Sequence, residues 1–254
     1  MSRNFELLQQ AIKYQVYPSA EENRTPVIKT HAPPNAVLPD KRIDKEIRRL
    51  VHRLFCCGDE HLPRVVVFSN IDRVDKSDWI WRAGEILAAQ KQGTVCLLDA
   101  NLALPSAHSY FGIDNGHGFI NALFEPASLI KFAYRMADTD ITVIPSGAST
   151  TREWPGRLSS GSMHLCIQAL RAQFDFVLIS APPIMTDSAT AIIGQWADGI
   201  VLVAEADCTQ PETALKAKRD LERANVRVLG AVMNNRKFPV PNWLSSRLQP
   251  VTRE

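Results

Sequence analysis

The chain of 254 residues is 45% hydrophobic and 22% charged, and its formal net charge at pH 7 is +2. This composition is typical of a globular protein with one substantial core, and the nearly balanced charge gives no reason to expect a nucleic-acid partner. The five cysteines show no metal-ligand spacing among themselves or with the six histidines, and their odd number favours a reducing compartment.

Two further features favour a soluble, cytoplasmic protein. No apolar run approaches the roughly 18 residues that a membrane-spanning helix needs. The first ten residues, MSRNFELLQQ, lack the apolar stretch of a secretory signal.

The N-terminal segment is predicted to be a helix followed by a linker. Apolar residues recur at helical spacing between Asn4 and Tyr17, and five prolines between Pro18 and Pro39 favour an extended chain. The helix either docks on a partner or folds back on its own domain. We expect three parts: residues 1–39 as helix and proline-rich linker, 40–240 as the main domain, and 241–254 as a tail.

The stretch from Asp40 to Phe55 predicts an amphipathic helix with a continuous apolar face. On the charged face, Glu46, Arg49 and His52 are spaced three residues apart, so they either reach across an interface or are simply solvated. The helix is followed by Cys56 and Cys57, which are interpreted as small buried residues at its end rather than as a redox pair.

A buried strand at Arg64–Phe68 leads into the loop Ser69–Trp79 and then a helix, which is the arrangement of a phosphate-binding loop. Such a loop needs glycines, because its backbone N–H groups must approach the phosphate oxygens closely. This loop has no glycine, and it carries three aspartates against one arginine and one lysine. We therefore predict that it has lost phosphate binding, and that Asp75 or Asp78 caps the helix in place of a phosphate.

Beyond Arg64, continuous apolar runs alternate with helical patterns, which is typical of βαβ units whose parallel sheet is covered on both faces. The predicted class is α/β: a three-layer P-loop NTPase-like fold with a mostly parallel central sheet. The predicted strands are Val65–Phe68, Val95–Leu98, Ile141–Ile144, Phe176–Ile179, Ile200–Ala204 and Val226–Met233. The predicted helices are Trp79–Gln90, Gly118–Phe124, Ser128–Met136, Ser160–Gln173, Asp187–Gln195 and Pro211–Arg223, the last opened by a capping box beginning at Thr209.

The segments that follow the strands are where ligands sit in such sheets, and they carry a specific resemblance. LLDANLALPSAHSYFGIDNGHGFINALFE (residues 97–125) and FDFVLISAPP (residues 174–183) resemble the bacterial tyrosine autokinases of capsule and exopolysaccharide export, which are MinD/ParA-like P-loop proteins. The resemblance covers about residues 40 to 240. It implies ATP and Mg²⁺ as cofactors, a homo-oligomer, and a membrane chain-length or copolymerase protein as partner.

The resemblance also assigns roles by position. Asp99 corresponds to the aspartate that assists magnesium and activates the acceptor tyrosine, and Asn234 lies where relatives read the adenine ring. Asp187 also matches the pattern. The Glu46, Arg49 and His52 set resembles the oligomerisation motif of the family, with His52 in place of its last arginine.

Other positions depart from the family pattern. Glycines are replaced by Val74 and Lys76, the lysine by Ser77, and the hydroxyl residue by Asp78, so Lys76, Ser77 and Asp78 form at most a degenerate nucleotide site. Shifting the alignment by one residue matches Lys76-Ser77 to the functional pair but places Val74 and Asp75 where glycine is required. Asn101 and Ser180 replace two further aspartates, and no tyrosine follows Tyr134, so the C-terminal tyrosine cluster is missing.

Three functions remain open. The favoured one is a cytoplasmic, catalytically silent scaffold or regulator of a membrane copolymerase, without a cofactor and peripheral at the inner membrane through that partner. The second is an active ATP-dependent tyrosine autokinase, in which Asp99 is catalytic and holds the metal. The third is a MinD/ParA-like positioning ATPase.

Overall fold

The computed structural model describes residues 29–31, 41–57, 62–72, 78–90, 93–148 and 160–235. The predicted N-terminal helix, the predicted tail at 241–254, and the loop residues Lys76 and Ser77 lie outside this part of the chain. Within it, no helix is both long and apolar enough to cross a membrane.

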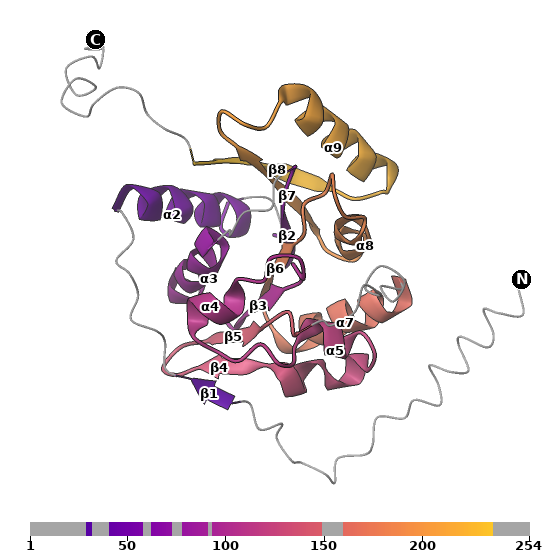
Figure 1. Cartoon of the computed structure of the whole chain (residues 1–254). Coiled ribbons are helices and arrows are strands. Elements are labelled where there is room, and N and C mark those ends of the chain that lie inside the picture. The colour runs from indigo at the N-terminus through magenta and orange to yellow at the C-terminus, as the bar shows by residue number, and fades with distance from the viewer. Residues whose placement is uncertain are drawn as a thin grey trace, which may run out of the picture.

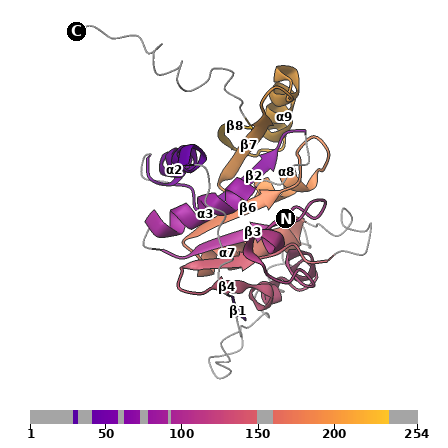
Figure 2. The same cartoon turned by 60° about the vertical axis from the view of Figure 1, so that its left-hand side comes forward.

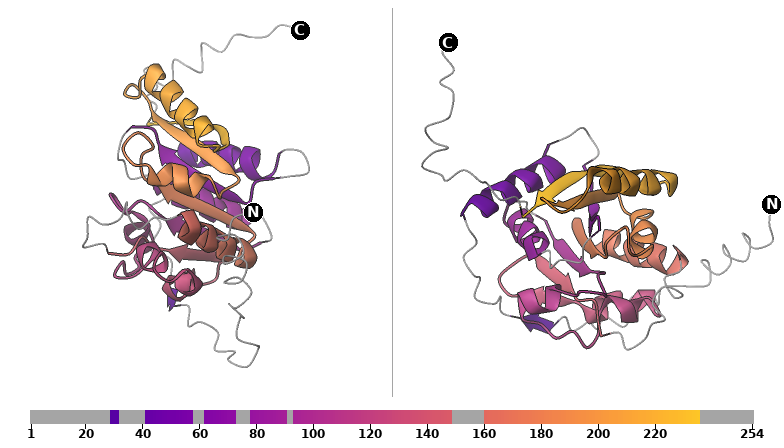
Figure 3. Two further views of the ribbon diagram at one scale, coloured as in Figure 1. Left: turned by 90° about the vertical axis from the view of Figure 1, so that its right-hand side faces the viewer. Right: turned by 45° about the horizontal axis from the view of Figure 1, so that its top comes forward.

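Eight strands of the described residues form one sheet in the order β1-β4-β5-β3-β6-β2-β7-β8. All neighbouring pairs are parallel except the antiparallel pair of β4 and β5, and the order can be followed across Figures 1 and 3 from β1 at one end to β8 at the other. The strands are β1 (Lys29–His31), β2 (Val65–Asn70), β3 (Val95–Asp99), β4 (Tyr134–Met136), β5 (Ile141–Ile144), β6 (Phe176–Ala181), β7 (Gly199–Glu205) and β8 (Val228–Asn234).

Helices cover both faces of the sheet, as Figures 1 and 2 show together. They are α2 (Lys41–Phe55), α3 (Asp78–Gln90), α4 (Ala107–Phe111), α5 (Phe119–Ala122), the 3₁₀ helix η1 (Pro126–Phe132), α7 (Ser160–Gln173), α8 (Ala189–Gly194) and α9 (Pro211–Arg223). Because alternate residues of a strand point to opposite faces, Val66 and Phe68 pack with α2, α3 and α4, whereas Val65 and Val67 pack with α5, α7, α8 and α9. The predicted α/β class with a mostly parallel, covered sheet is confirmed.

Some predicted elements were wrong. The segment Ser128–Met136, predicted as one helix, is a 3₁₀ helix that ends at Phe132, followed by strand β4. Pairing of β4 with β5 supplies backbone hydrogen bonds that outweigh the local helical preference. The strand β1 lies inside the stretch predicted as linker, and α4 was not predicted at all. Thr209 does not cap α9: the helix begins after Gln210 with a proline in its first turn and without a side-chain cap.

The prediction for the cysteine pair was also wrong in part. Helix α2 ends at Phe55, whose side chain is buried, and the chain then turns outward. Cys56 is half-buried and Cys57 is exposed. The two residues after a helix point in different directions, so only one of them could reach the core.

The edge of the sheet opposite the carboxyl ends of its strands is held by one carboxylate. Asp198 Oδ2 accepts hydrogen bonds from the backbone N–H groups of Arg64 (2.7 Å) and Val65 (2.8 Å), at the start of β2. Arg171 of α7 donates to Asp198 Oδ1 at 2.6 Å. Partial burial raises the pKa of Asp198, but these hydrogen bonds outweigh burial and lower it overall.

Candidate functional site

The candidate site lies at the carboxyl ends of the strands, where the chain leaves β2. Backbone hydrogen bonds fix this exit on both sides: Ile71 N–H donates to Val203 O at 2.9 Å, and Ile184 N–H donates to Asn70 O at 3.0 Å. Met185 N–H also donates to Ile71 O at 3.0 Å. The start of the loop after β2 is therefore held by the segment that follows β6 and by β7 itself.

The described residues continue after this loop with helix α3, which begins at Asp78, one residue earlier than predicted. Asp78 is exposed in the first turn, where a carboxylate interacts favourably with the helix dipole. Trp79 is half-buried, and its ring meets Phe68 edge-on at a centroid distance of 5.6 Å, so it covers the sheet. The predicted site residues Lys76 and Ser77, and the proposed cap Asp75, lie outside the described residues.

Asp99 ends β3 and is 1% exposed. Its Oδ2 accepts hydrogen bonds from the N–H groups of Ser106 (2.8 Å) and Ala107 (2.9 Å), and its Oδ1 accepts one from the N–H of Asn101 (3.1 Å). Burial raises the pKa of Asp99, while the three N–H groups act in the opposite direction. The carboxylate therefore acts as an anchor for the start of α4, and both of its oxygens already have protein donors.

Ser180 lies beside Asp99 on the neighbouring strand β6, and the two residues are register partners. Ser180 is 5% exposed, and its carbonyl accepts a hydrogen bond from Ala100 N–H at 2.8 Å. A hydroxyl in this position supplies no negative charge, whereas Mg²⁺ sites in proteins use carboxylates and phosphate oxygens. Asp187 lies in the loop between β6 and α8 and accepts a hydrogen bond from Ala189 N–H, at the start of α8, at 2.8 Å.

A buried hydrogen bond links the start of α4 to α3. Trp81, which is fully buried, donates from Nε1 to Ser106 Oγ at 2.9 Å, and Ser106 N–H in turn donates to Asp99. The sequence predicted Trp81 as part of the helix Trp79–Gln90 but did not predict this hydrogen bond. The only feature of the sequence that pointed to this contact was Ser106, which follows Pro105 in the motif after β3.

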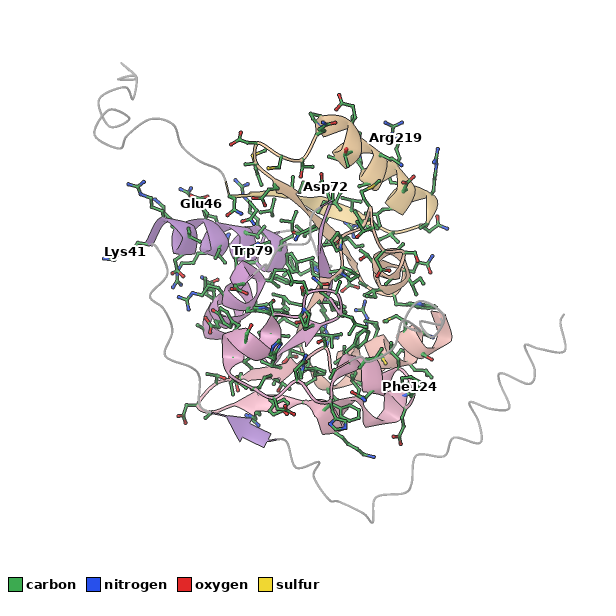
Figure 4. The ribbon with its side chains drawn as sticks, viewed as in Figure 1. Lys41, Glu46, Asp72, Trp79, Phe124 and Arg219 are labelled. Carbon is green, nitrogen blue, oxygen red and sulfur yellow. The ribbon has the colours of Figure 1, made fainter. Side chains whose placement is uncertain are left out.

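The far corner of the site is a polar network around Asp72. Asp72 Oδ1 accepts a hydrogen bond from Thr209 Oγ1 at 2.9 Å, and the same hydroxyl accepts one from Glu205 N–H at 2.9 Å. Asn235 Nδ2 donates to Glu205 Oε1 at 2.7 Å. Figure 4 shows Asp72 near the strand ends beneath α9. This network connects the loops after β2, β7 and β8, and sequence reasoning missed it because its members lie far apart along the chain.

Asn234, the predicted adenine reader, ends β8 and is the register partner of Glu205. Its carbonyl accepts a hydrogen bond from Ala206 N–H at 2.9 Å. The structure therefore places Asn234, on β8, at the corner of Asp72 and Glu205, whereas Ser180 on β6 and Asp99 on β3 lie three and four strands away from it. Among the described residues, no three His, Cys, Asp or Glu side chains come together in a way that could hold a metal ion.

The predicted oligomerisation residues lie together on the outer face of α2. Glu46, labelled in Figure 4 on the side of α2 away from α3, accepts a hydrogen bond from Arg49 Nη1 at 2.7 Å, and both side chains are exposed. His52 is also exposed, but its contact is with Cys57, whose Sγ lies 3.1 Å from His52 Nδ1. The three residues therefore share a surface, as their spacing predicted.

A chain of polar contacts joins this helix to the site. Arg82 of α3 donates from Nε to Asp44 of α2 at 2.8 Å and from Nη1 to Glu85 at 2.8 Å. Tyr110 of α4 donates to the same Glu85 oxygen at 3.2 Å. Burial, followed by the charge of Glu85, raises the pKa of Tyr110. The hydrogen bond to Arg82 lowers the pKa of Asp44 despite the opposing effect of burial.

Comparison with known sequences finds tyrosine kinases, although no family model matches the chain. The chain is 30% identical over 185 residues to "Tyrosine-protein kinase YwqD" of Bacillus subtilis, covering 68% of this chain and 78% of that protein. It is 26% identical over 153 residues to "Putative tyrosine-protein kinase CapB" of Staphylococcus aureus, covering 60% and 65%. It is 28% identical over 140 residues to "Putative tyrosine-protein kinase EpsB" of Ralstonia nicotianae, of which it spans only 18%.

Solved structures of bacterial tyrosine kinase domains and of a MinD protein share the fold of this chain. The chimerical protein CapA2B2 superposes with a TM-score of 0.70 at 18% identity, covering 80% of this chain and 88% of that one. The kinase domain of VpsO has a TM-score of 0.67 at 20% identity, covering 80% and 100%. The MinC:MinD complex of Aquifex aeolicus has a TM-score of 0.57 at 16% identity, covering 72% of each. The predicted P-loop NTPase-like fold is thus confirmed.

Proposed function

The chain belongs to the bacterial tyrosine-protein kinase family, and from this premise we propose that it is a catalytically silent member of that family. In this proposal it serves as a scaffold or regulator in capsule or exopolysaccharide biosynthesis and export. It binds partners through its surface and does not transfer phosphate.

The observation that carries the proposal is the state of Asp99. A carboxylate that holds magnesium, or that takes a proton from a tyrosine, must present an oxygen to the ligand. Asp99 is 1% exposed, and its two oxygens accept three backbone hydrogen bonds. Its neighbour Ser180 has no charge with which to complete a metal site. This pair does not fit the magnesium ion that the family uses.

The composition of the loop after β2 gives independent support. Phosphoryl transfer depends almost entirely on positioning and on charge neutralisation. The loop from Ser69 to Trp79 contains no glycine, and Asp72, Asp75 and Asp78 add negative charge where a polyphosphate would have to sit. The Asp72 carboxylate is also held in place by its hydrogen bond from Thr209. A phosphate bound in this loop would therefore either lie beside this negative charge or have to break the hydrogen bond.

The proposed partner is a membrane chain-length or copolymerase protein, which would hold this chain at the inner membrane from the cytoplasmic side. The proposed domain is residues 40–240, and the proposed self-association surface is the outer face of α2 with Glu46, Arg49 and His52. Their common exposure on one helix face supports this surface.

The test is a calorimetric titration of the purified chain with Mg-ATP and with Mg-ADP. A silent scaffold gives no binding heat and no nucleotide-dependent rise in melting temperature, because a ligand stabilises only the state that it binds. The matched control restores the family residues with Val74→Gly, Lys76→Gly, Ser77→Lys, Asp78→Thr and Ser180→Asp. We expect nucleotide-dependent stabilisation only in this variant.

Two outcomes contradict the proposal in different ways. Transfer of radiolabel from ATP to tyrosine in the unaltered chain identifies an active tyrosine kinase. Nucleotide binding with nucleotide-dependent dimerisation, but without tyrosine labelling, identifies a positioning ATPase of the MinD/ParA kind.

A further inference from the structure

The end of α2 carries a thiol and an imidazole in direct contact, apart from the site described above. Cys57 Sγ lies 3.1 Å from His52 Nδ1, and both side chains are exposed. At this distance the imidazole is positioned to accept the thiol proton as the sulfur attacks an electrophile. The thiolate is the nucleophilic form of cysteine.

The pair is open to solvent. His52 lies in the last turn of α2, Cys57 follows the end of this helix, and both side chains are exposed. The neighbouring Arg48 and Arg49 are held in ion pairs with Asp44 and Glu46. The thiol therefore lies in a solvent-accessible position beside a proton acceptor, which is an arrangement that activates a cysteine.

The other four cysteines differ from Cys57 in ways that make them internal references. Cys96 and Cys166 are buried, and burial raises the pKa of Cys166 to about 12 and that of Cys96 still further. Cys56 is half-buried against the core. Cys208 is exposed like Cys57, but it follows Asp207, and its N–H donates to the carbonyl of Glu205 in an acidic loop.

We propose that Cys57 and His52 form a reactive thiol–imidazole pair, and that Cys57 is a site of reversible modification by low-molecular-weight disulfides. The thiol proton passes to His52. The Cys57 sulfur then attacks one sulfur of the disulfide and forms a mixed disulfide, and the S–S bond that breaks leaves the other sulfur as a free thiolate. No further oxidant is needed, and a second thiol reverses the step.

The modified residue would lie on the same helix as Glu46 and Arg49. A bulky group on Cys57 would lie at the end of the self-association surface. It would also contact His52, which is part of that surface. This consequence rests on the proposed self-association surface, whereas the reactivity of Cys57 does not.

The experiment measures alkylation of the native, full-length chain by iodoacetamide at neutral pH, with the rates at Cys57 and Cys208 resolved by peptide mass spectrometry. We expect Cys57 to react about tenfold faster than Cys208. His52→Gln should slow Cys57 to the rate of Cys208 and leave Cys208 unchanged. Cys57→Ser reports the rate of the neighbouring Cys56, and circular dichroism confirms that each variant is folded.

A second variant separates charge from proton transfer. His52→Arg keeps a cation beside the thiol but removes the proton acceptor, so we expect a rate between that of His52→Gln and that of the unaltered chain. Incubation of the unaltered chain with oxidised glutathione should then give a mixed disulfide at Cys57, removable by dithiothreitol. Equal rates at Cys57 and Cys208, a His52→Arg variant as fast as the unaltered chain, or glutathionylation that favours Cys208 would each overturn the proposal.

Discussion

At the residue scale, Asp99 shows what a sequence motif does and does not determine. The motif after the predicted strand Val95–Leu98 correctly placed this aspartate at the carboxyl end of a buried strand, which the structure extends to include it. It did not predict that Ser106 and Ala107 turn their N–H groups back onto the carboxylate. That contact depends on where the chain travels after Pro105, and this path is fixed by packing of α4 and by Trp81 rather than by local sequence.

The role of Asp99 as an anchor leads to a prediction about stability. Asp99→Ala leaves three N–H donors in the interior without their acceptor, and we expect it to lower the free energy of unfolding by about 2–4 kcal/mol. Urea denaturation measures this difference. The control is Asp140→Ala, because Asp140 is exposed and its ion pair with Arg135 is long, at 3.9 Å. An Asp99→Ala variant as stable as this control would mean that the buried contacts contribute nothing.

At the element scale, the sequence correctly predicted the strands that are marked by continuous apolar runs. It did not predict the short elements that form only because neighbouring strands or side chains bind them. Strands β2, β3, β5 and β6 are nearly continuous apolar runs, so their identity was clear from the sequence. Strand β4 has only three residues, with the middle one exposed, and it exists because β5 and β1 pair with it. The five-residue helix α4 likewise depends on Asp99, since helices this short are unstable alone.

The packing of α3 on the sheet gives a prediction for Gly84. A Cβ at this position would clash with Leu97 Cδ2 of β3, and Leu97 is fully buried. Gly84→Ala gains about 1 kcal/mol of helix propensity, but we expect the steric conflict to exceed this gain and to lower the melting temperature.

The matched control for this substitution is Gly230→Ala in β8, where a Cβ would meet nothing within 4 Å. Thermal unfolding followed by circular dichroism compares the two variants. A Gly84→Ala protein that melts above the unaltered chain would show that α3 can shift away from β3 without loss.

At the scale of the whole molecule, the sheet order explains why the site residues could not be assembled from sequence. The chain visits β2 and β3 in succession, but β6 inserts between them, and this brings Ser180 beside Asp99. Only the resemblance to the tyrosine autokinases had indicated that Asp99 and Ser180 belong to one site. The link between Asp72 and Thr209, and the support of α2 by Arg82, follow from the assembled fold of this chain.

The global stability of the sheet should depend on pH through Asp198. The hydrogen bonds from Arg171, Val65 and Arg64 hold the pKa of this carboxyl below its ordinary value of 3.8 in the folded state. A depressed folded-state pKa means that the stabilisation is fully present above the unfolded-state pKa and is lost as pH falls through the folded-state value. Stability from this group is therefore constant near neutrality and declines below about pH 4.

Asp198→Asn tests this directly. We expect a loss of about 1–3 kcal/mol at pH 7, because a charge-assisted hydrogen-bond set that joins β2, β7 and α7 is weakened. The difference between the variant and the unaltered chain should shrink as urea denaturation is repeated at progressively lower pH below 4. A difference that stays constant down to pH 2 would assign the effect to packing rather than to charge.

The edge strand β1 has a consequence for the order in which the molecule assembles. Its three residues pair with β4, so that Lys29 meets Tyr134 from more than a hundred positions away along the chain. Closing so long a loop costs conformational entropy, and the few hydrogen bonds of β1 offset this cost only after β4 and β5 have paired. We therefore expect this edge to form last during folding and to detach first, as a local opening that leaves the remaining seven strands intact.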